Sequence, residues 1–515
     1  MLGFGFSLTG GSAELLMKMD ASARTRILTE LFGQDPGQLD ISVVRLTVGA
    51  SDMNSFVFSY DDMPEGETDW DLKHFSLAQD LKDVVPVMQE ILSIHPDIWV
   101  MASPWSAPAW MKEEYDVRGP KLRRDCYDVY ARYLAKYIVE MGKKGIHIDA
   151  LTIQNEPLNS RNTPSMPWSP EDQTVFIRDY LGPQFDKQGI ATDILLFDHN
   201  CDRPDYPLAI LEDPKAASYA AGSAFHHYMG DLSAMTQMHD FRPDKDIYFT
   251  EQMVVDRSGG PVTRQIAPSA KRMLVDIPRN WSRDVILWNL AADPEANPHT
   301  GNGGCPFCFG AITLDGNTVT RNLAYYVVAH ASAAVPAGSL RIHSTAPDDP
   351  AGFLFEDEQA PGVMRFMRYD KAGVLPNIAY CTPDGRVVLI VTNTSSSAQR
   401  VKIQYHGQFA DVSSLWARSA LIRGPYEKDV DCHRPFRGRG PAGADFLHLR
   451  VVEARRAAFL AGGRCGRNDH VPPQGPEGPG GQAGLRRGQS PRPGDETAPR
   501  RRLGDHHRPG RSGRV

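Results

Sequence analysis

Residues 149–157 read DALTIQNEP and predict the end of a β-strand. A short apolar run leads into Asn155, Glu156 and Pro157. Because proline cannot continue a β-ladder, Glu156 is expected at the end of a strand. Seven further β-branched or aromatic runs alternate with helical patterns between residues 1 and 292. They lie at 2–8, 42–49, 98–104, 193–199, 222–228, 246–252 and 284–290. Eight strands joined by helices predict an α/β fold, a (β/α)8 TIM barrel.

The clearest helix is expected at 125–141. Its apolar residues recur at helical spacing, so they form one face that a barrel helix would bury against the sheet. They are Cys126, Val129, Tyr130, Tyr133, Leu134, Tyr137, Ile138 and Met141. Gly142 and Gly145 follow and are expected to stop the helix before the next strand.

The pattern changes after the barrel. Residues 338–405 alternate as short strands do, and Pro383-Asp384-Gly385 is a hairpin turn signal between two of them. The sequence therefore predicts a barrel over 1–335 and an antiparallel β-sandwich side domain over 336–430. A third segment, 431–515, completes the chain.

The third segment has a different composition from the rest. It contains 17 Arg, no Lys and 8 acidic residues, with abundant Gly and Pro. Such a segment cannot bury enough apolar surface to offset its ordering entropy, so a disordered tail is expected. The absence of Lys favours a reading-frame shift near residues 412–430, which would leave the β-domain incomplete. A native disordered extension is the alternative.

Overall composition excludes several classes of protein. The net charge of −7 gives no reason to expect nucleic-acid binding. No apolar run approaches the length of a membrane span, and no secretory signal is visible at the start. Cys305 and Cys308 form a lone CxxC, which favours a structural or local-disulfide role over zinc binding.

Two strand ends carry a glutamate: Glu156 after the fourth strand and Glu251 at the end of the seventh. Active sites of such barrels lie at the carboxyl ends of the strands, and glycoside hydrolysis needs two carboxyl groups around the scissile bond. Asn155 is placed to hydrogen-bond a sugar 2-hydroxyl. A single glutamate is usually a surface charge, but this pair in this setting indicates a catalytic site.

The chain resembles glycoside hydrolase family 30, the glucosylceramidase family. The matching segments are GFGFSLTGGSA (3–13), VVRLTVGASD (43–52), FSL (75–77), ASPWSAPAWMK (102–112), TIQNEP (152–157), AFHHY (224–228), YFTEQ (248–252) and ILWNLA (286–291). The resemblance implies a retaining double-displacement mechanism that requires neither cofactor nor metal. It also implies that Glu156 is the acid/base and Glu251 the nucleophile.

The resemblance assigns further residues. Arg45 would support the nucleophile, and an Arg between apolar strand neighbours needs a buried partner. Asp52 and Trp105 match glucose-contacting positions, with a place in the core as the alternative for Trp105. Tyr228 lies beside the nucleophile, and Trp288 fits the floor of the subsite. His226 and His227 flank Tyr228, and either could be a core histidine with its hydrogen bonds satisfied.

The loop after the eighth strand departs from the glucosylceramide-cleaving members. It reads ANPHTGNGGCPFCFGAITLDG (296–316) and resembles the branch that cuts β-1,6-glucans. The expected substrate is therefore a β-linked glucan, with a glucosyl lipid or another β-linked sugar as alternatives. An inactive, truncated carbohydrate-binding pseudoenzyme is the rival from another class. Family members are often secreted, which is the expectation for localisation.

Overall fold

The computed structural model describes residues 1–255, 265–344, 352–356, 364–368, 375–395, 398–405, 408–415, 420–423 and 448–452. All described residues belong to one compact unit, Met1–Arg455.

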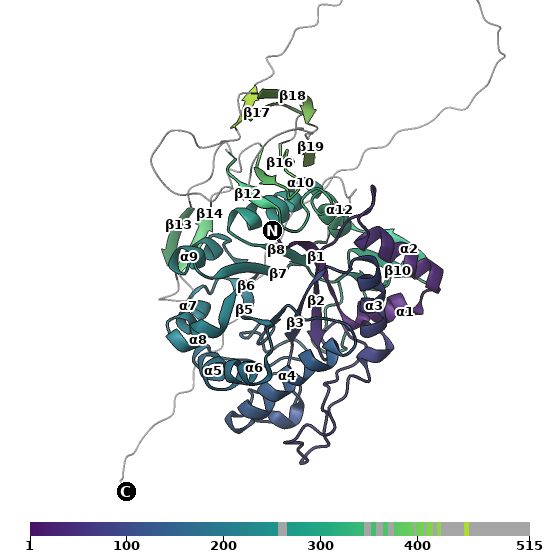
Figure 1. The fold of residues 1–515 in the computed structure, drawn as a ribbon, viewed down its shortest axis with the longest axis vertical. Helices are drawn as coiled ribbons and strands as arrows, with labels where there is room; N and C mark the ends of the chain where they lie inside the picture. The colour runs from purple at the N-terminus through teal and green to yellow at the C-terminus, as the bar shows by residue number, and fades with distance from the viewer. Residues whose placement is uncertain are drawn as a thin grey trace, which may run out of the picture. The chain divides into compact units, whose positions relative to one another are not determined.

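Eight parallel strands form one sheet in the order β7-β6-β5-β4-β3-β2-β1-β8. They are β1 (Gly3–Leu8), β2 (Val43–Val48), β3 (Trp99–Pro104), β4 (Ala150–Thr152), β5 (Asp193–Cys201), β6 (Ala220–Gly230), β7 (Asp246–Glu251) and β8 (Asp284–Leu287). The two edges meet, because Arg283 N–H donates to Ile247 O at 2.9 Å and Trp288 N–H to Gln252 O at 2.9 Å. The predicted (β/α)8 barrel is confirmed (Figure 1).

The interior of the barrel is filled with side chains. One cluster takes a single buried residue from each of seven strands: Val43, Met101, Ala150, Leu195, Ala224, Tyr248 and Ile286. Such a layer makes the barrel a packed core that holds the strand ends in fixed positions. The strand ends can therefore carry a site of defined geometry.

The predicted helix at 125–141 is observed as α4 (Tyr127–Gly142), which buries its expected apolar face. Helices surround the strands in Figure 1. The other barrel helices are α1 (Gly10–Lys18), α2 (Ala21–Phe32), α3 (Val84–Ile94), α5 (Pro170–Phe176), α6 (Gly182–Gln188), α7 (Asp205–Leu211), α8 (Pro214–Tyr219), α9 (Ser233–Phe241), α10 (Ile266–Ala270), α11 (Ile277–Arg279) and α12 (Leu323–Ala329). Within the described residues, no helix is long and apolar enough to cross a membrane.

The predicted hairpin in the β-domain is also observed. Strands β15 (Asn377–Cys381) and β16 (Val387–Thr392) pair antiparallel on either side of the Pro383-Asp384-Gly385 turn. Gly385 has φ +81°, a left-handed conformation that glycine adopts without strain. The remaining strands of this region are β12 (Leu340–Ile342), β13 (Gly352–Glu356), β14 (Met364–Arg368), β17 (Gln399–Tyr405), β18 (Gln408–Leu415), β19 (Ala420–Arg423) and β20 (His448–Val452).

Strand β20 corrects part of the expectation for the tail. It lies inside 431–515, where no strand was expected, and pairs antiparallel with β17. Leu449 and Val451 alternate with polar residues there, which is a strand pattern within a biased composition. The rest of 431–515 lies outside the described residues, so the disordered tail and the frame shift stay predictions.

A small sheet of β9 (Ala291–Ala292), β10 (Ile312–Asp315) and β11 (Thr318–Arg321) follows β8.

Candidate active site

A cleft of about 880 Å³ opens at the carboxyl ends of the barrel strands. Its walls come from strands β5 and β6 and from the loops after β2, β4, β5, β7 and β8. Of the residues expected from the sequence, five line it: Asp52, Glu156, Tyr228, Glu251 and Trp288. The cleft therefore gathers residues that lie up to 236 positions apart, because every barrel strand ends on the same face.

Glu251, the last residue of β7, is held at both carboxylate oxygens. Arg45 Nη1 donates to Oε2 at 2.7 Å, and the Tyr228 hydroxyl donates to Oε1 at 2.9 Å. Arg45 comes from the middle of β2 and is fully buried. The structure thus places both residues that were expected beside Glu251 in direct contact with it.

Asp198, which sequence reasoning missed, lies beneath the site as a buried anchor. It accepts hydrogen bonds from Arg45 Nη2 (2.9 Å), Ser103 Oγ (2.7 Å), Thr152 Oγ1 (2.8 Å), His226 Nε2 (2.9 Å) and Thr250 Oγ1 (2.6 Å). Burial alone would raise the pKa of Asp198, but the charges of Arg45 and His226 hold it well below its usual range. An acidic residue inside the apolar run DILLFDH was the available signal, since a buried charge requires a partner.

Glu156 follows β4 with a left-handed backbone, φ +46°. Its N–H donates to Asp198 O at 2.9 Å, which ties the strand end to β5. His226 Nδ1 lies 3.2 Å from Oε1, and Asn159 Nδ2 donates to Oε2 at 2.7 Å. Burial would raise the pKa of Glu156, but the contact and charge of His226, the charge of His199 and the amide of Asn159 lower it to about 2.

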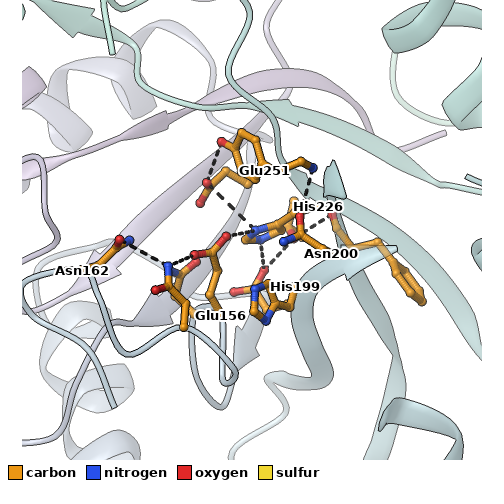
Figure 2. A network of polar contacts seen from close by, with 12 residues as sticks. Glu156, Asn162, His199, Asn200, His226 and Glu251 are labelled. Atoms are coloured by element: carbon orange, nitrogen blue, oxygen red, sulfur yellow. Dashed lines mark hydrogen bonds and ion pairs between the residues drawn. The ribbon is translucent and has the colours of Figure 1, made fainter. Parts of the chain in front are cut away.

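His226 lies between the two candidate catalytic carboxylates (Figure 2). The sequence left it as a possible core histidine, and it is fully buried, but its partners are functional groups. Its Nδ1 is 3.2 Å from Glu156 Oε1 and 4.0 Å from Glu251 Oε1, while Nε2 is 2.9 Å from Asp198. Burial would lower the pKa of His226, but these three carboxylates raise it to about 9. The ring therefore carries a positive charge at neutral pH.

The two carboxyls act on each other. Burial raises the pKa of Glu251, and the negative charge of Glu156 adds to this rise, against the charges of His226 and Arg45. Once Glu156 takes up a proton, its repulsion disappears. Arg45 and Tyr228 then stabilise Glu251 as a carboxylate.

Two tryptophans and one asparagine complete the site. Trp288 lines the cleft, and Trp105 stacks on it with ring centroids 5.4 Å apart. Trp105 is 1% exposed, so it backs the cleft wall, where sequence reasoning had expected sugar contact. Asn155 Oδ1 accepts from Arg45 Nη2 at 2.7 Å, which orients the amide and leaves Nδ2 as its donor.

Asp52 differs from the other acidic groups, because no cation is bonded to it in the described part of the chain. Burial and the negative charges of Glu251 and Glu156 raise its pKa to about 8. Its carboxyl is therefore mostly protonated at neutral pH and can donate a hydrogen bond to a sugar hydroxyl.

The loop after β8 contributes the outer wall of the cleft. Cys305 and Cys308 form a disulfide there, so the local-disulfide prediction is confirmed. Thr300 N–H donates to Asp52 O at 2.9 Å and fastens this loop to the loop after β2.

One oxygen each of Glu156 and Glu251 and a ring nitrogen of His226 lie within 4.8 Å of one another. These are metal-ligand types in metal-ligand geometry. However, Arg45 is bonded to Glu251 and His226 carries a proton, so positive charge already occupies the cluster and repels a cation. The arrangement fits two carboxyls that share protons.

Comparison with known proteins gives consistent results. Residues 1–332 match the glycosyl hydrolase family 30 TIM-barrel domain, and residues 366–420 match the beta sandwich domain of that family. An endo-1,6-beta-D-glucanase of Neurospora crassa is 30% identical over 354 residues, covering 67% of this chain and 72% of the relative. Putative glucosylceramidase 2 of Caenorhabditis elegans is 29% identical over 361 residues, covering 66% and 68%. The solved structure of the endo-beta1,6-glucanase BT3312 has a TM-score of 0.70 at 28% identity, covering 82% of this chain and 89% of that chain.

Proposed function

Because the chain belongs to glycoside hydrolase family 30, we propose that it hydrolyses β-1,6-linked glucan with Glu251 as nucleophile and Glu156 as general acid/base. It is an O-glycosyl hydrolase for β-glucosidic bonds with the retaining mechanism of its family. The proposal concerns the residues that carry the reaction and the linkage that is cleaved.

The spacing of the two carboxyls is the observation that carries the residue assignment. Oxygens of Glu156 and Glu251 lie within 4.8 Å of each other. Retaining enzymes place their carboxyls about 5–5.5 Å apart, whereas inverting enzymes need about 6.5–9.5 Å to fit a water molecule. A direct attack by Glu251 on the anomeric carbon suits this short separation.

The reaction has two steps. Glu251 attacks the anomeric carbon while Glu156 donates its proton to the leaving oxygen, which gives a covalent glycosyl-enzyme. Glu156, now a carboxylate, then deprotonates the water that hydrolyses this intermediate. Arg45 and Tyr228 keep the nucleophile charged and aligned, and Asn155 is oriented to donate to the 2-hydroxyl of the sugar.

The size and lining of the cleft support a glucan as substrate. About 880 Å³ exceeds the volume of one sugar. Strand β5 and the loops after β4 and β5 line the cleft with the polar side chains of Asn159, Arg161, Asn162, Asn200 and Arg203. The hydroxyls of a leaving sugar can hydrogen-bond to these side chains, while the apolar side chains of Met229, Met253 and Phe307 in the same cleft can pack against the face of a sugar ring. Similarity to two endo-1,6-glucanases supports the same linkage.

The test is a hydrolysis panel of pustulan-type β-1,6-glucan, glucosylceramide and an aryl β-glucoside. We expect the glucan to be the best substrate by kcat/KM, with the β-anomer as the first product in a proton NMR time course. Release of ceramide without activity on the glucan would transfer the assignment to the lipid. An α-anomer as first product would refute the roles of both glutamates.

A further inference from the structure

Asn159, in the loop between β4 and α5, is held in one orientation. Its Oδ1 accepts from Arg161 N–H at 2.9 Å, so its Nδ2 must be the donor that faces Glu156 Oε2 at 2.7 Å. The same Nδ2 lies 3.2 Å from Asn162 Oδ1. Asn159 N–H also donates to Glu156 O at 2.8 Å, which fixes the turn that carries the side chain.

The two oxygens of Glu156 face different surroundings. Oε1 faces His226, which is fully buried, whereas Oε2 faces Asn159, which lines the cleft together with Asn162. Figure 2 shows Asn162 and His226 on opposite sides of Glu156. Oε2 is thus the oxygen bonded to a residue of the cleft lining, and a leaving oxygen that approaches Oε2 meets the Asn159 amide there.

We propose that Asn159 keeps Glu156 ionised in the free enzyme and is displaced by the sugar that binds on the leaving-group side. Binding of that sugar then converts Glu156 into its acid form. This inference rests on the proposed function, since it assumes that Glu156 is the general acid.

The chemistry of the contact supports this coupling. An N–H donor stabilises a carboxylate and opposes its protonation, and a hydrogen bond to a charged group is stronger than one between neutral groups. When the amide leaves Oε2, the proton on His226 Nδ1 can pass to Oε1, which it faces, and rotation of the carboxyl group about its Cγ–Cδ bond then presents that O–H to the leaving oxygen. His226 becomes neutral and keeps its Nε2–H on Asp198. The total number of protons in the site does not change.

Other titratable groups around Glu156 bear on the same equilibrium. The groups that face it or interact with it through the cleft are His199 on β5, His226 and Tyr228 on β6, Glu251 on β7 and Asp52 after β2. Filling the cleft expels water, and a low dielectric disfavours the His226–Glu156 ion pair relative to its neutral form. Sugar binding therefore favours protonated Glu156 in two ways, by displacing the Asn159 amide and by expelling water. The freed Asn159 amide gains hydroxyl partners on the sugar.

The experiment compares Asn159→Ala and Asn159→Asp with the wild type, as kcat/KM across pH on two substrates. Phenyl β-glucoside needs acid assistance but brings no leaving-group sugar. On the alkaline side of the optimum, where the rate follows the fraction of protonated Glu156, we expect Asn159→Ala to be about tenfold faster than wild type on this substrate. Asn159→Asp keeps the Arg161 contact but places a negative charge beside Glu156, so its gain should be larger.

On β-1,6-glucan the same variants should lose about threefold to tenfold in kcat/KM near the optimum, because one hydrogen bond to the leaving sugar is gone. Asn162→Ala is the matched control: it removes only the second partner of the amide and should shift both substrates in the same directions by less. Thermal melting checks that each variant is folded.

Opposite effects on the two substrates support the proposal, since a merely structural role cannot raise activity. Equal losses on both substrates at every pH, with unchanged melting temperature, would overturn it. A wild-type enzyme that hydrolyses neither substrate would instead overturn the proposed function itself.

Discussion

Glu251 and Glu156 face each other across one cleft, but the protein holds them in different ways. Glu251 is bonded to a fully buried guanidinium and a tyrosine hydroxyl, both carried by barrel strands. Glu156 is bonded to an imidazole that can lose its proton and to an amide on a loop. One carboxyl has a permanent counter-charge and the other has partners that can change.

This difference matches what a nucleophile and an acid/base each require. A nucleophile must stay ionised, so a permanent charge from Arg45 suits it. An acid/base must alternate between two protonation states, so partners that move or titrate suit it. Asp198 connects the surroundings of the two glutamates, because it binds both Arg45, which contacts Glu251, and His226, which contacts Glu156.

Replacing Glu251, the carboxyl with the permanent counter-charge, gives the largest expected effect. Glu251→Ala should lower kcat by several orders of magnitude on every substrate, because no covalent intermediate forms. Azide added to this variant should restore turnover and give an α-glycosyl azide, as seen by NMR. A β-glycosyl azide from Glu251→Ala would exchange the roles of the two residues.

Replacing Glu156 tests the carboxyl whose partners can move or lose a proton. Glu156→Ala should lose much less activity on an activated aryl glucoside such as dinitrophenyl β-glucoside than on phenyl β-glucoside or glucan, because a good leaving group needs no proton. The measurement is the slope of log kcat/KM against the pKa of the leaving group, which should become steeper. An unchanged slope would contradict acid catalysis by Glu156.

Replacing Asp198 removes the carboxylate that binds both Arg45 and His226. Asp198→Asn keeps the shape but leaves Arg45 partly uncompensated, so the free energy of unfolding should fall by about 3–5 kcal/mol in urea titration. The pKa of His226 should fall too, because one of the carboxylates that raise it is lost. Ser103→Ala, which removes one neutral donor, serves as the milder control. A stable variant with unchanged histidine titration would show that Asp198 is not the shared anchor.

Asp52 extends the comparison to a carboxyl that lacks a bonded cation, and its expected effect on stability is spread over several pH units. Its pKa is about 8 in the folded protein, above its ordinary value of 3.8, so the folded state binds an extra proton between these pH values. Its contribution to stability is present below pH 4 and is lost as pH rises towards 8, by up to about 1.4 kcal/mol per pH unit.

Asp52→Asn should therefore flatten the fall of melting temperature with rising pH between about 4 and 8. Asn317→Ala, in the exposed turn between β10 and β11, should leave the slope of melting temperature against pH as it is in the wild type. Identical slopes for Asp52→Asn and wild type would indicate that Asp52 is ionised in the folded protein.

Local sequence patterns were enough to predict the barrel, its eight strands, the hairpin at 383–385 and the two strand ends that carry Glu156 and Glu251. These features are local, since alternation, turn residues and proline act over a few positions. Arg45 could also be anticipated, because a guanidinium inside an apolar strand must find a buried partner.

The groups that surround the two glutamates could not be predicted in this way, because they meet only in the folded chain. Asp198, His226 and Asn159 reach the site from a strand interior, the neighbouring strand and a loop, and nothing in their local sequence fixes those distances. Trp105 shows the same limit, because its place behind Trp288 depends on packing between β3 and β8. Protonation states follow burial and charges brought together from β2, β5, β6 and β7, so they arise only when the barrel closes.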